Sequence, residues 1–243
     1  MQNNFFIFVR SSIFYMLFAA LVLLVSVPLT LLLLFTPQAY RYKNKAIYFL
    51  LAVLYKGVAY LAPITFVVKK TSVPMPFPAL YVANHQSAAD IAALGFIQGT
   101  APHFWFYWDR FASVPFFSFY IKRLGLGITQ RNARQDATTV LRGISLLKSG
   151  ECNALIFPEG GRFIDGKVHD FQCGFALLAR KASVPVVPVC IQGMGSAYPP
   201  GSFLIYPHHI TITIGEPLTL VADESDETFC ARVHQWFDNC TRV

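Results

Sequence analysis

A long uncharged run near the start of the chain constrains its fold more than any other feature. No charged residue occurs from Ser11 to Tyr40, and residues 12–35 are almost wholly apolar. A helix of about 24 residues rises roughly 36 Å, which exceeds the ~30 Å hydrocarbon core of a bilayer. The run is too long for a removable signal peptide, and a weak cleavage context follows it. We therefore predict an N-terminal membrane helix, which Pro28 kinks.

A second apolar run, residues 46–61, is shorter, contains Lys56 and ends before Pro63. Two arrangements fit this pattern. In one, the first helix spans the membrane and the basic residues after it stay in the cytoplasm. In the other, both helices form a hairpin dipped into the cytoplasmic leaflet, with Lys56 snorkelling to the surface. Both arrangements make residues 1–63 an anchor at the inner (cytoplasmic) membrane and leave residues 64–243 on its cytoplasmic face.

The net charge of +7 comes wholly from the N-terminal third. Residues 1–89 contain seven basic residues and no acidic one, whereas residues 90–243 contain thirteen of each sign. Because this excess flanks apolar runs, the predicted partner is a membrane with anionic lipids. Nucleic acid is excluded as a partner, since no nucleic-acid-binding motif is present. The sequence gives no indication of oligomeric state.

The five cysteines are scattered, odd in number and without a CxxC pair. This pattern argues against a disulfide framework and a zinc site, and it suits a reducing compartment with buried free thiols. The histidines outside residues 81–90 lack a paired set of metal ligands. We predict neither a metal nor a bound cofactor.

From residue 64 onward, short β-rich runs alternate with helical stretches. Strands are predicted at 64–68, 79–83, 103–107, 153–157, 184–189 and 210–215, and helices at 88–97, 133–148 and 172–181. Such alternation is typical of an α/β domain with a mostly parallel central sheet flanked by helices. In these sheets, the loops at the carboxyl ends of strands form the functional site.

The loop after residue 83 reads NHQSAAD and supports two interpretations. Ser87 and Asp90 have the spacing of a capping box, in which case Asp90 only stabilises the start of a helix. Alternatively, His85 is a base and Asp90 its partner. The two interpretations are compatible if the helix begins at Ser87, because His85 then lies on the turn and Asp90 points back to it.

Two further loops carry unusual residues. FPEGGRF, after the strand at 153–157, combines Glu159 and Arg162 with Gly160 and Gly161, whose backbone N–H groups can form an anion-binding concavity. Arg131 follows the glycine-punctuated run GLGIT. On these segments alone, a solvated ion pair and a surface arginine are the simpler interpretations.

Taken together, these residues resemble the glycerolipid acyltransferase family, whose bacterial archetype is 1-acylglycerol-3-phosphate acyltransferase. Four blocks occur in order: His85 to Asp90 in NH-x4-D, Gly127 to Arg131, Phe157 to Arg162 in F-P-E-G-x-R, and the apolar VPVVPV at 184–189. The resemblance covers about residues 64–220.

This resemblance implies transfer of a fatty acyl group from acyl-CoA or acyl carrier protein, as co-substrate, to the hydroxyl of 1-acylglycerol-3-phosphate, giving phosphatidic acid. His85 would be the general base and Asp90 would fix its tautomer. The Gly160–Gly161 loop would stabilise the oxyanion, Arg131 and Arg162 would bind phosphate, and Glu159 would orient the loop or the acceptor.

The sequence also departs from the family pattern. Gln172 stands where a lysine is usual, and YWDRF replaces a lysine-rich stretch. These departures leave other acceptors open, such as a lyso-ornithine lipid or another lysophospholipid, and a non-catalytic lipid-binding scaffold is a further alternative. The aromatic run at 114–125 is interpreted either as core or as a surface that enters the bilayer or lines the acyl channel.

Overall fold

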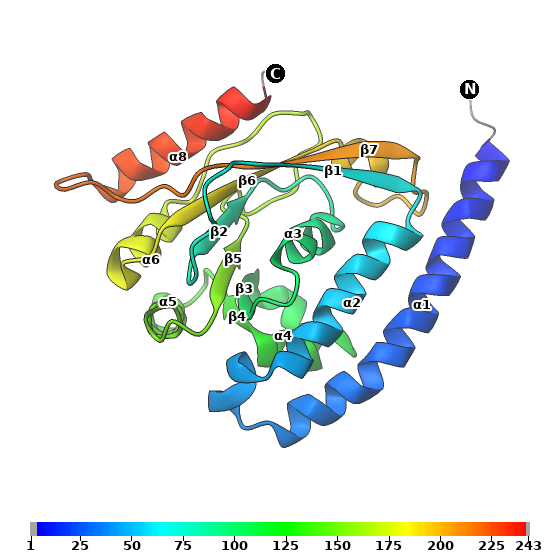
Figure 1. Ribbon diagram of the computed structural model, residues 1–243, viewed down its shortest axis with the longest axis horizontal. Helices are drawn as coiled ribbons and strands as arrows, with labels where there is room; N and C mark the ends of the chain where they lie inside the picture. The colour runs from blue at the N-terminus through cyan, green and yellow to red at the C-terminus, as the bar shows by residue number, and fades with distance from the viewer. Residues whose placement is uncertain (1–3, 242–243) are drawn as a thin grey trace.

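Two helices come first in the chain, as the apolar runs predict. In the computed structural model, which describes residues 4–241, α1 spans Asn4–Phe35 and α2 spans Lys45–Leu61, joined by the 3-10 turn η1 at Gln38–Lys43. Pro28 lies inside α1 and does not end it. The two helices run antiparallel, and α1 curves along the outside of α2 (Figure 1). Among the described residues, α1 alone is long and apolar enough to cross a membrane.

A single sheet forms the centre of the molecule, with the strand order β1-β7-β6-β2-β5-β3-β4. The strands are β1 (Ile64–Lys70), β2 (Leu80–Ala83), β3 (His103–Trp108), β4 (Gly125–Ile128), β5 (Asn153–Ile156), β6 (Val186–Gln192) and β7 (His208–Ile214). All neighbours pair in parallel except β6 and β7, which are antiparallel. The predicted α/β class with a mostly parallel sheet is therefore confirmed.

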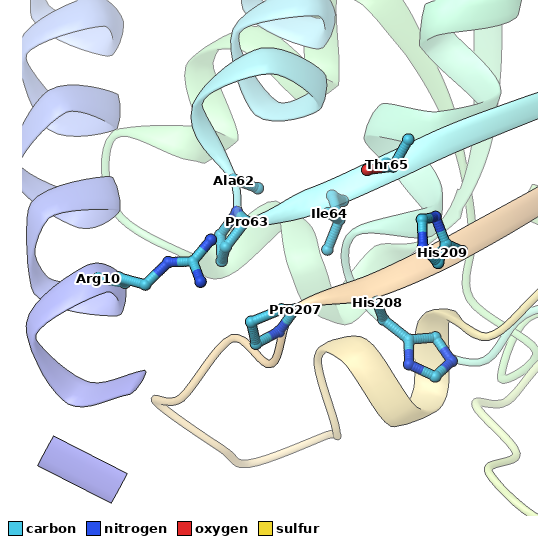
Figure 2. Close-up of a pocket in the computed structure, with 8 residues that line it drawn as sticks. All are labelled: Arg10, Ala62, Pro63, Ile64, Thr65, Pro207, His208 and His209. Atoms are coloured by element: carbon cyan, nitrogen blue, oxygen red, sulfur yellow. The ribbon is translucent and has the colours of Figure 1, made fainter. Parts of the chain in front are cut away.

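The antiparallel pairing of β6 and β7 decides which strand ends lie at the same edge of the sheet. In the antiparallel pair, Gln192 at the end of β6 lies opposite Thr211 near the start of β7. Since β1 is parallel to β7, with Ile64 beside His208, β1 also begins at the edge where β2 and β6 end. A pocket of about 390 Å³ lies there between α1 and the two strand starts, lined by Arg10, residues 62–65 and residues 207–209 (Figure 2).

The remaining helices are α3 (Asp90–Gln98), α4 (Phe117–Leu124), α5 (Ala133–Lys148), α6 (Gly174–Ala182), α7 (Met194–Ala197) and α8 (Asp226–Thr241), with a 3-10 turn η2 at Asp109–Ser113. The prediction for α5 matches its bounds. The predictions for α3 and α6 begin two residues too early. Helices α4 and α8 were not predicted.

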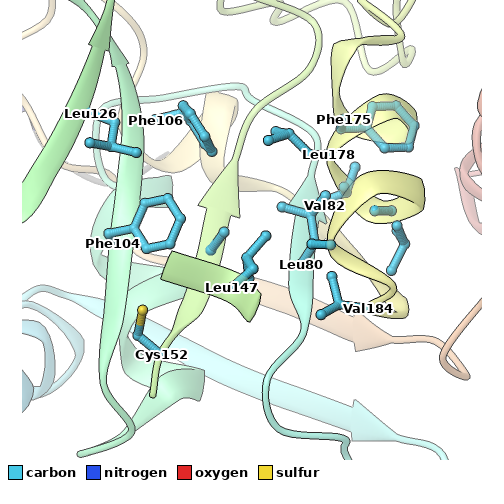
Figure 3. Close-up of a cluster of buried hydrophobic side chains, with 14 of the residues drawn as sticks. Leu80, Val82, Phe104, Phe106, Leu126, Leu147, Cys152, Phe175, Leu178 and Val184 are labelled. Atoms are coloured by element: carbon cyan, nitrogen blue, oxygen red, sulfur yellow. The ribbon is translucent and has the colours of Figure 1, made fainter. Parts of the chain in front are cut away.

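Both faces of the sheet are buried, because successive side chains of each strand point to opposite sides. Leu80 and Val82 of β2 join the cluster under α5, α6 and α8, whereas Tyr81 and Ala83 join the cluster on the other face. Figure 3 shows the first cluster, in which side chains from the strands meet those from α5 and α6.

The helical hairpin is part of this core rather than a separate unit. Leu29 and Leu33 of α1 and Ile47 of α2 are buried in the same cluster as the sheet. Near the other end of α1, the buried Ser11 hydroxyl accepts a hydrogen bond from the Ile205 N–H at 2.9 Å. The hairpin is thus fixed to the sheet domain along its length.

A buried polar chain also ties α2 to the sheet. His103 Nδ1 donates to the Ala101 carbonyl at 2.9 Å, and Nε2 lies 3.2 Å from the Tyr55 hydroxyl, which also accepts from the Trp105 indole N–H at 3.3 Å. Both ring nitrogens are satisfied by a neutral imidazole. Burial lowers the pKa of His103 to about 4 and raises the pKa of Tyr55 to about 12.

The expectation that the cysteines are free thiols is wrong for two of them. Cys173 and Cys230 form a disulfide that links the start of α6 to α8. The sequence separation of 57 residues hides this pairing, since no spacing rule brings the two cysteines together. Cys152, Cys190 and Cys240 are free.

Candidate active site

His85 and Asp90 meet at the carboxyl end of β2. His85 Nδ1 lies 2.9 Å from Asp90 Oδ2. With the carboxylate as acceptor, Nδ1 is the donor and the ring's lone pair is on Nε2. Asp90 is fully buried, whereas His85 is partly exposed. The pair therefore has the geometry of a base held in one tautomer.

Asp90 holds this pair through more than one contact. The same oxygen, Oδ2, also accepts from the backbone N–H groups of Gln86 at 2.6 Å and Ser87 at 2.7 Å. The preceding residue is fixed too, because Asn84 exchanges two side-chain hydrogen bonds with the Ile191 backbone on β6. The turn that carries His85 is thus tied to two strands and one helix.

The prediction that Ser87 caps the helix is wrong in part. The regular α-helix begins at Asp90, and its N-cap, Ala89, makes no side-chain cap. Ser87 instead donates to the Tyr198 carbonyl at 2.7 Å, while Ala89 N–H reaches its oxygen at 3.3 Å. One half of the capping box is present, since Asp90 Oδ2 accepts from the Ser87 N–H. The later helix start still leaves His85 on the turn.

Glu159 joins the loop after β5 to the histidine turn. Its Oε1 accepts from the His85 backbone N–H at 2.7 Å, and its Oε2 accepts from the His169 backbone N–H at 3.0 Å. Burial raises the pKa of Glu159, and these two N–H groups oppose that rise. Its contacts fix the loop, which is one of the two roles the sequence left open.

Aromatic and backbone contacts complete the enclosure of His85. The Phe157 ring stacks on the imidazole at a centroid distance of 4.1 Å. Phe163 N–H donates to the His85 carbonyl at 2.9 Å, and the Phe163 ring stacks on His169 at 3.8 Å. The His85 ring is therefore held on one face and along its backbone, while Nε2 has no hydrogen-bond partner among residues 4–241.

Gly160 and Gly161 differ in what their N–H groups do. Gly160 has φ +62° and donates to the Phe157 carbonyl at 3.2 Å, so its N–H is occupied. Gly161 N–H makes no hydrogen bond within the described part of the chain. Glycine is favoured at 160 by φ, and a Cβ there would displace the end of the Gln172 side chain, whose amide nitrogen lies 2.6 Å away.

Gln172 connects this loop to the GLGIT segment. Its Oε1 accepts from Gln130 Nε2 at 3.3 Å, and its backbone N–H donates to the Pro158 carbonyl at 2.9 Å. The sequence marks Gln172 only as a departure from the family pattern, and its bridging role was not predicted. The adjacent Arg131 follows Gln130, whose N–H is held by Asp136 at 2.8 Å.

Arg131 and Arg162 lie on these two loops and are exposed. Neither makes an ion pair or hydrogen bond with another residue in the range 4–241. The structure thus brings together His85, Asp90, Glu159 and the Gly160–Gly161 loop, and leaves the two guanidinium groups free at the rim.

Comparison with known proteins agrees with this arrangement. Residues 65–192, more than half of the chain, match the acyltransferase family. This chain belongs to that family.

The predicted relationship to the glycerolipid acyltransferases is confirmed by similarity to curated members. One is the chloroplastic 1-acyl-sn-glycerol-3-phosphate acyltransferase LPAT1 of Arabidopsis thaliana, which is 33% identical over 143 residues, 58% of this chain and 39% of that protein. Another is the enzyme of the same name from Saccharomyces cerevisiae, 30% identical over 131 residues, 51% of this chain and 41% of that protein.

These matches span less than half of the length of both acyltransferase relatives. One solved structure matches the fold over almost the whole chain. The crystal structure of the 1-acyl-sn-glycerophosphate acyltransferase PlsC from Thermotoga maritima superposes with a TM-score of 0.77, at 22% identity, over 97% of this chain and 96% of that one. The helical hairpin is included in that coverage, so hairpin and sheet domain belong to one shared fold.

Proposed function

We propose that this acyltransferase moves a fatty acyl group from a thioester donor, acyl-CoA or acyl carrier protein, to the hydroxyl of 1-acylglycerol-3-phosphate. The observation that carries the proposal is the His85–Asp90 pair at 2.9 Å, set beside the Glu159 loop at the carboxyl edge of a parallel sheet. The names of the relatives supply the acceptor.

In the proposed reaction, His85 Nε2 removes the proton from the acceptor hydroxyl as its oxygen attacks the thioester carbonyl. Asp90 stabilises the imidazolium that forms. Collapse of the tetrahedral intermediate breaks the C–S bond, and the imidazolium returns its proton to the departing sulfur. An ester and a free thiol result, with no covalent acyl-enzyme.

Two further groups support this chemistry. Gly161 N–H is the oxyanion donor of choice, because the Gly160 N–H already bonds to Phe157. Arg131 and Arg162 would bind the acceptor phosphate, since each is unpaired at the rim and a guanidinium matches phosphate bidentately.

A second acceptor class has its own supporting observation. Gln172, a neutral amide, lies against Gly160 in the position where the family pattern has a lysine. A neutral side chain there favours acceptors with less negative charge than a phosphate monoester, such as a lyso-ornithine lipid or a lysophospholipid with a diester headgroup.

Membrane attachment through the hairpin is also proposed. α1 contacts the sheet domain at Ser11 and again at Thr30, whose hydroxyl lies 2.7 Å from that of Tyr120. These contacts are about 28 Å apart along the helix. A helix held to the domain over that length cannot cross a bilayer away from it, which favours the dipped hairpin at the cytoplasmic face over a spanning helix.

The test is lipid mass spectrometry of the purified full chain with a panel of lysolipids and both donor types, together with thiol release from acyl-CoA. We expect phosphatidic acid from 1-acylglycerol-3-phosphate, and His85→Ala reduces it to a few per cent or less. A neutral or zwitterionic acceptor used in preference would establish the second candidate. No thiol release with any pair would show that the protein binds lipid without turnover.

A further inference from the structure

The segment between β3 and α4 exposes apolar side chains that nothing in the sheet domain covers. Phe111, Val114, Phe116 and Phe117 are 40%, 44%, 61% and 46% exposed. Phe116 also has φ +66°, a conformation that bulky residues rarely adopt. A strained, exposed aromatic side chain is costly in water, so a non-aqueous environment is indicated for this segment.

This segment adjoins the outward face of α1. The Phe116 ring packs against Tyr120 at a centroid distance of 5.4 Å. The Tyr120 hydroxyl in turn lies 2.7 Å from the Thr30 hydroxyl and donates to the Ser26 carbonyl at 3.4 Å. One tyrosine therefore places the aromatic segment beside the C-terminal third of α1.

Helix geometry makes the two apolar surfaces continuous. At 100° per residue, Leu23, Val27 and Leu34 lie about 60° to 100° around α1 from Ser26. They are 66%, 63% and 56% exposed. The buried residues Val25, Leu29 and Leu33 lie on the opposite side of Ser26. The exposed face of α1 thus begins where Tyr120 binds, on the side away from the core.

Charge at the border of this surface fits a lipid headgroup layer. Arg110 stacks on Trp108 at 4.4 Å and on Phe111 at 5.2 Å, and Arg123 stacks on Phe119 at 3.7 Å. Lys122 lies beside Arg123, and the single acidic residue of this stretch, Asp109, precedes Arg110. Basic groups that flank exposed aromatic side chains are typical of a surface that enters an anionic leaflet.

We infer that residues 111–117 form a second membrane contact, in which Val114, Phe116 and Phe117 enter the acyl-chain region of the leaflet that holds α1. This inference rests on the proposed membrane attachment of the hairpin. Because the segment directly follows β3, it would hold the carboxyl edge of the sheet, where His85 lies, against the lipid surface. The lysolipid acceptor would then reach the site from the leaflet.

The test measures fluorescence quenching of the full chain in vesicles of phosphatidylcholine and phosphatidylglycerol with brominated acyl chains. Phe116→Trp and Phe117→Trp keep an apolar aromatic side chain, and each adds one indole to the three of the parent. Leu24→Trp reports on the exposed face of α1. Val221→Trp, in the loop before α8, is the matched control, since Val221 is apolar and 60% exposed and α8 lies across the molecule from α1 (Figure 1).

We expect the added indole at 116, at 117 and at 24 to be quenched, and that at 221 to stay unquenched. Quenching at 24 without quenching at 116 or 117 would overturn the second contact and leave hairpin attachment standing. Absence of quenching at 24, 116 and 117 would overturn membrane attachment and this inference together. It would leave the proposed acyl transfer standing, because that reaction can be measured separately with soluble short-chain lysolipids.

Discussion

At the scale of single residues, Asp90 carries more contacts than any other polar side chain of the site. Three N–H groups converge on its Oδ2, whereas its buried Oδ1 has no hydrogen-bond partner among the described residues. The charge of Asp90 can therefore be removed without removing an oxygen from the place where the three donors meet. This separates its electrostatic role from its structural one.

We expect Asp90→Asn to fold and to lose activity by on the order of 10³- to 10⁴-fold in kcat, because the amide no longer stabilises the imidazolium. Asp165→Asn is the matched control, since Asp165 bonds to His169 at the same 2.9 Å but is exposed. Steady-state kinetics and thermal unfolding of both variants decide the point. Comparable losses in the two would contradict the assignment.

A second residue-scale test concerns Gly160. Gly160→Ala should cost activity because its Cβ would meet the Gln172 amide at 2.6 Å and displace the side chain that ties this loop to Gln130. Gly166→Ala is the control for backbone strain, since Gly166 has φ +76° with open space around it. Both variants should lose about 1 kcal/mol of folding free energy, and only Gly160→Ala should lose acyl transfer. Equal activity in the two variants would show that the loop tolerates displacement.

Parts of the site that lie within short sequence motifs could be predicted, whereas contacts between segments far apart in the sequence could not. His85, Asp90 and Glu159 were predictable because a short motif carries each one. The bridge made by Gln172 was not, since it joins loops that are 42 residues apart through a weakly specific amide. The Cys173–Cys230 disulfide and the true start of α3 could not be predicted for the same reason, since both depend on contacts between distant segments. Ser87 bonds to Tyr198, 111 residues away, rather than to its own helix.

At the scale of elements, the connection between α2 and β3 depends on a histidine that must stay neutral. The pKa of His103 is lowered from 6.5 to about 4 by burial, so the unfolded chain binds a proton that the folded chain does not. Stability from this group is complete above pH 6.5 and falls as the pH drops toward 4. The loss is on the order of 3 kcal/mol at the acid end.

We expect unfolding free energies in detergent to fall between pH 7.5 and 5, and His103→Gln to reduce that slope. Glutamine offers an N–H for Ala101 and an oxygen for Tyr55 but does not titrate in this range. Urea unfolding of both proteins at several pH values gives the comparison. An identical slope in the variant would assign the pH dependence to other groups.

Strand and helix bounds were predictable to within a few residues where hydrophobic periodicity is strong, as in α5. The reversal of β7 was not, because alternation of strands and helices indicates parallel pairing throughout. Helix α4 went unpredicted because it has only eight residues, which is too short for a hydrophobic period to be distinguished from a general aromatic run. Of the two interpretations of the run at 114–125, the exposure of Val114, Phe116 and Phe117 favours a bilayer-facing surface over core for its first residues.

At the scale of the whole molecule, the excess of basic residues lies in the N-terminal third, together with the exposed apolar face of α1. We expect binding to phosphatidylcholine vesicles to be insensitive to salt, because the apolar face of α1 drives it. Vesicles with anionic lipid should bind more tightly, by about 1 kcal/mol for each basic residue near the surface, and lose that gain in high salt. Sedimentation of vesicles at two salt concentrations measures both. Equal salt dependence on the two lipids would contradict the predicted role of the basic residues.

The pairing of β1 has a consequence for the order in which the protein is made. Its sheet partner within the described chain is β7, and Ile64 lies beside His208, roughly 140 residues later. At about 5 to 20 residues per second, the ribosome reaches β7 some 7 to 30 seconds after β1. With the proposed attachment, the hairpin reaches the membrane while the strand that follows it has no neighbour. Lys69 and Lys70, at the end of β1, would then discourage that exposed edge from joining other nascent chains.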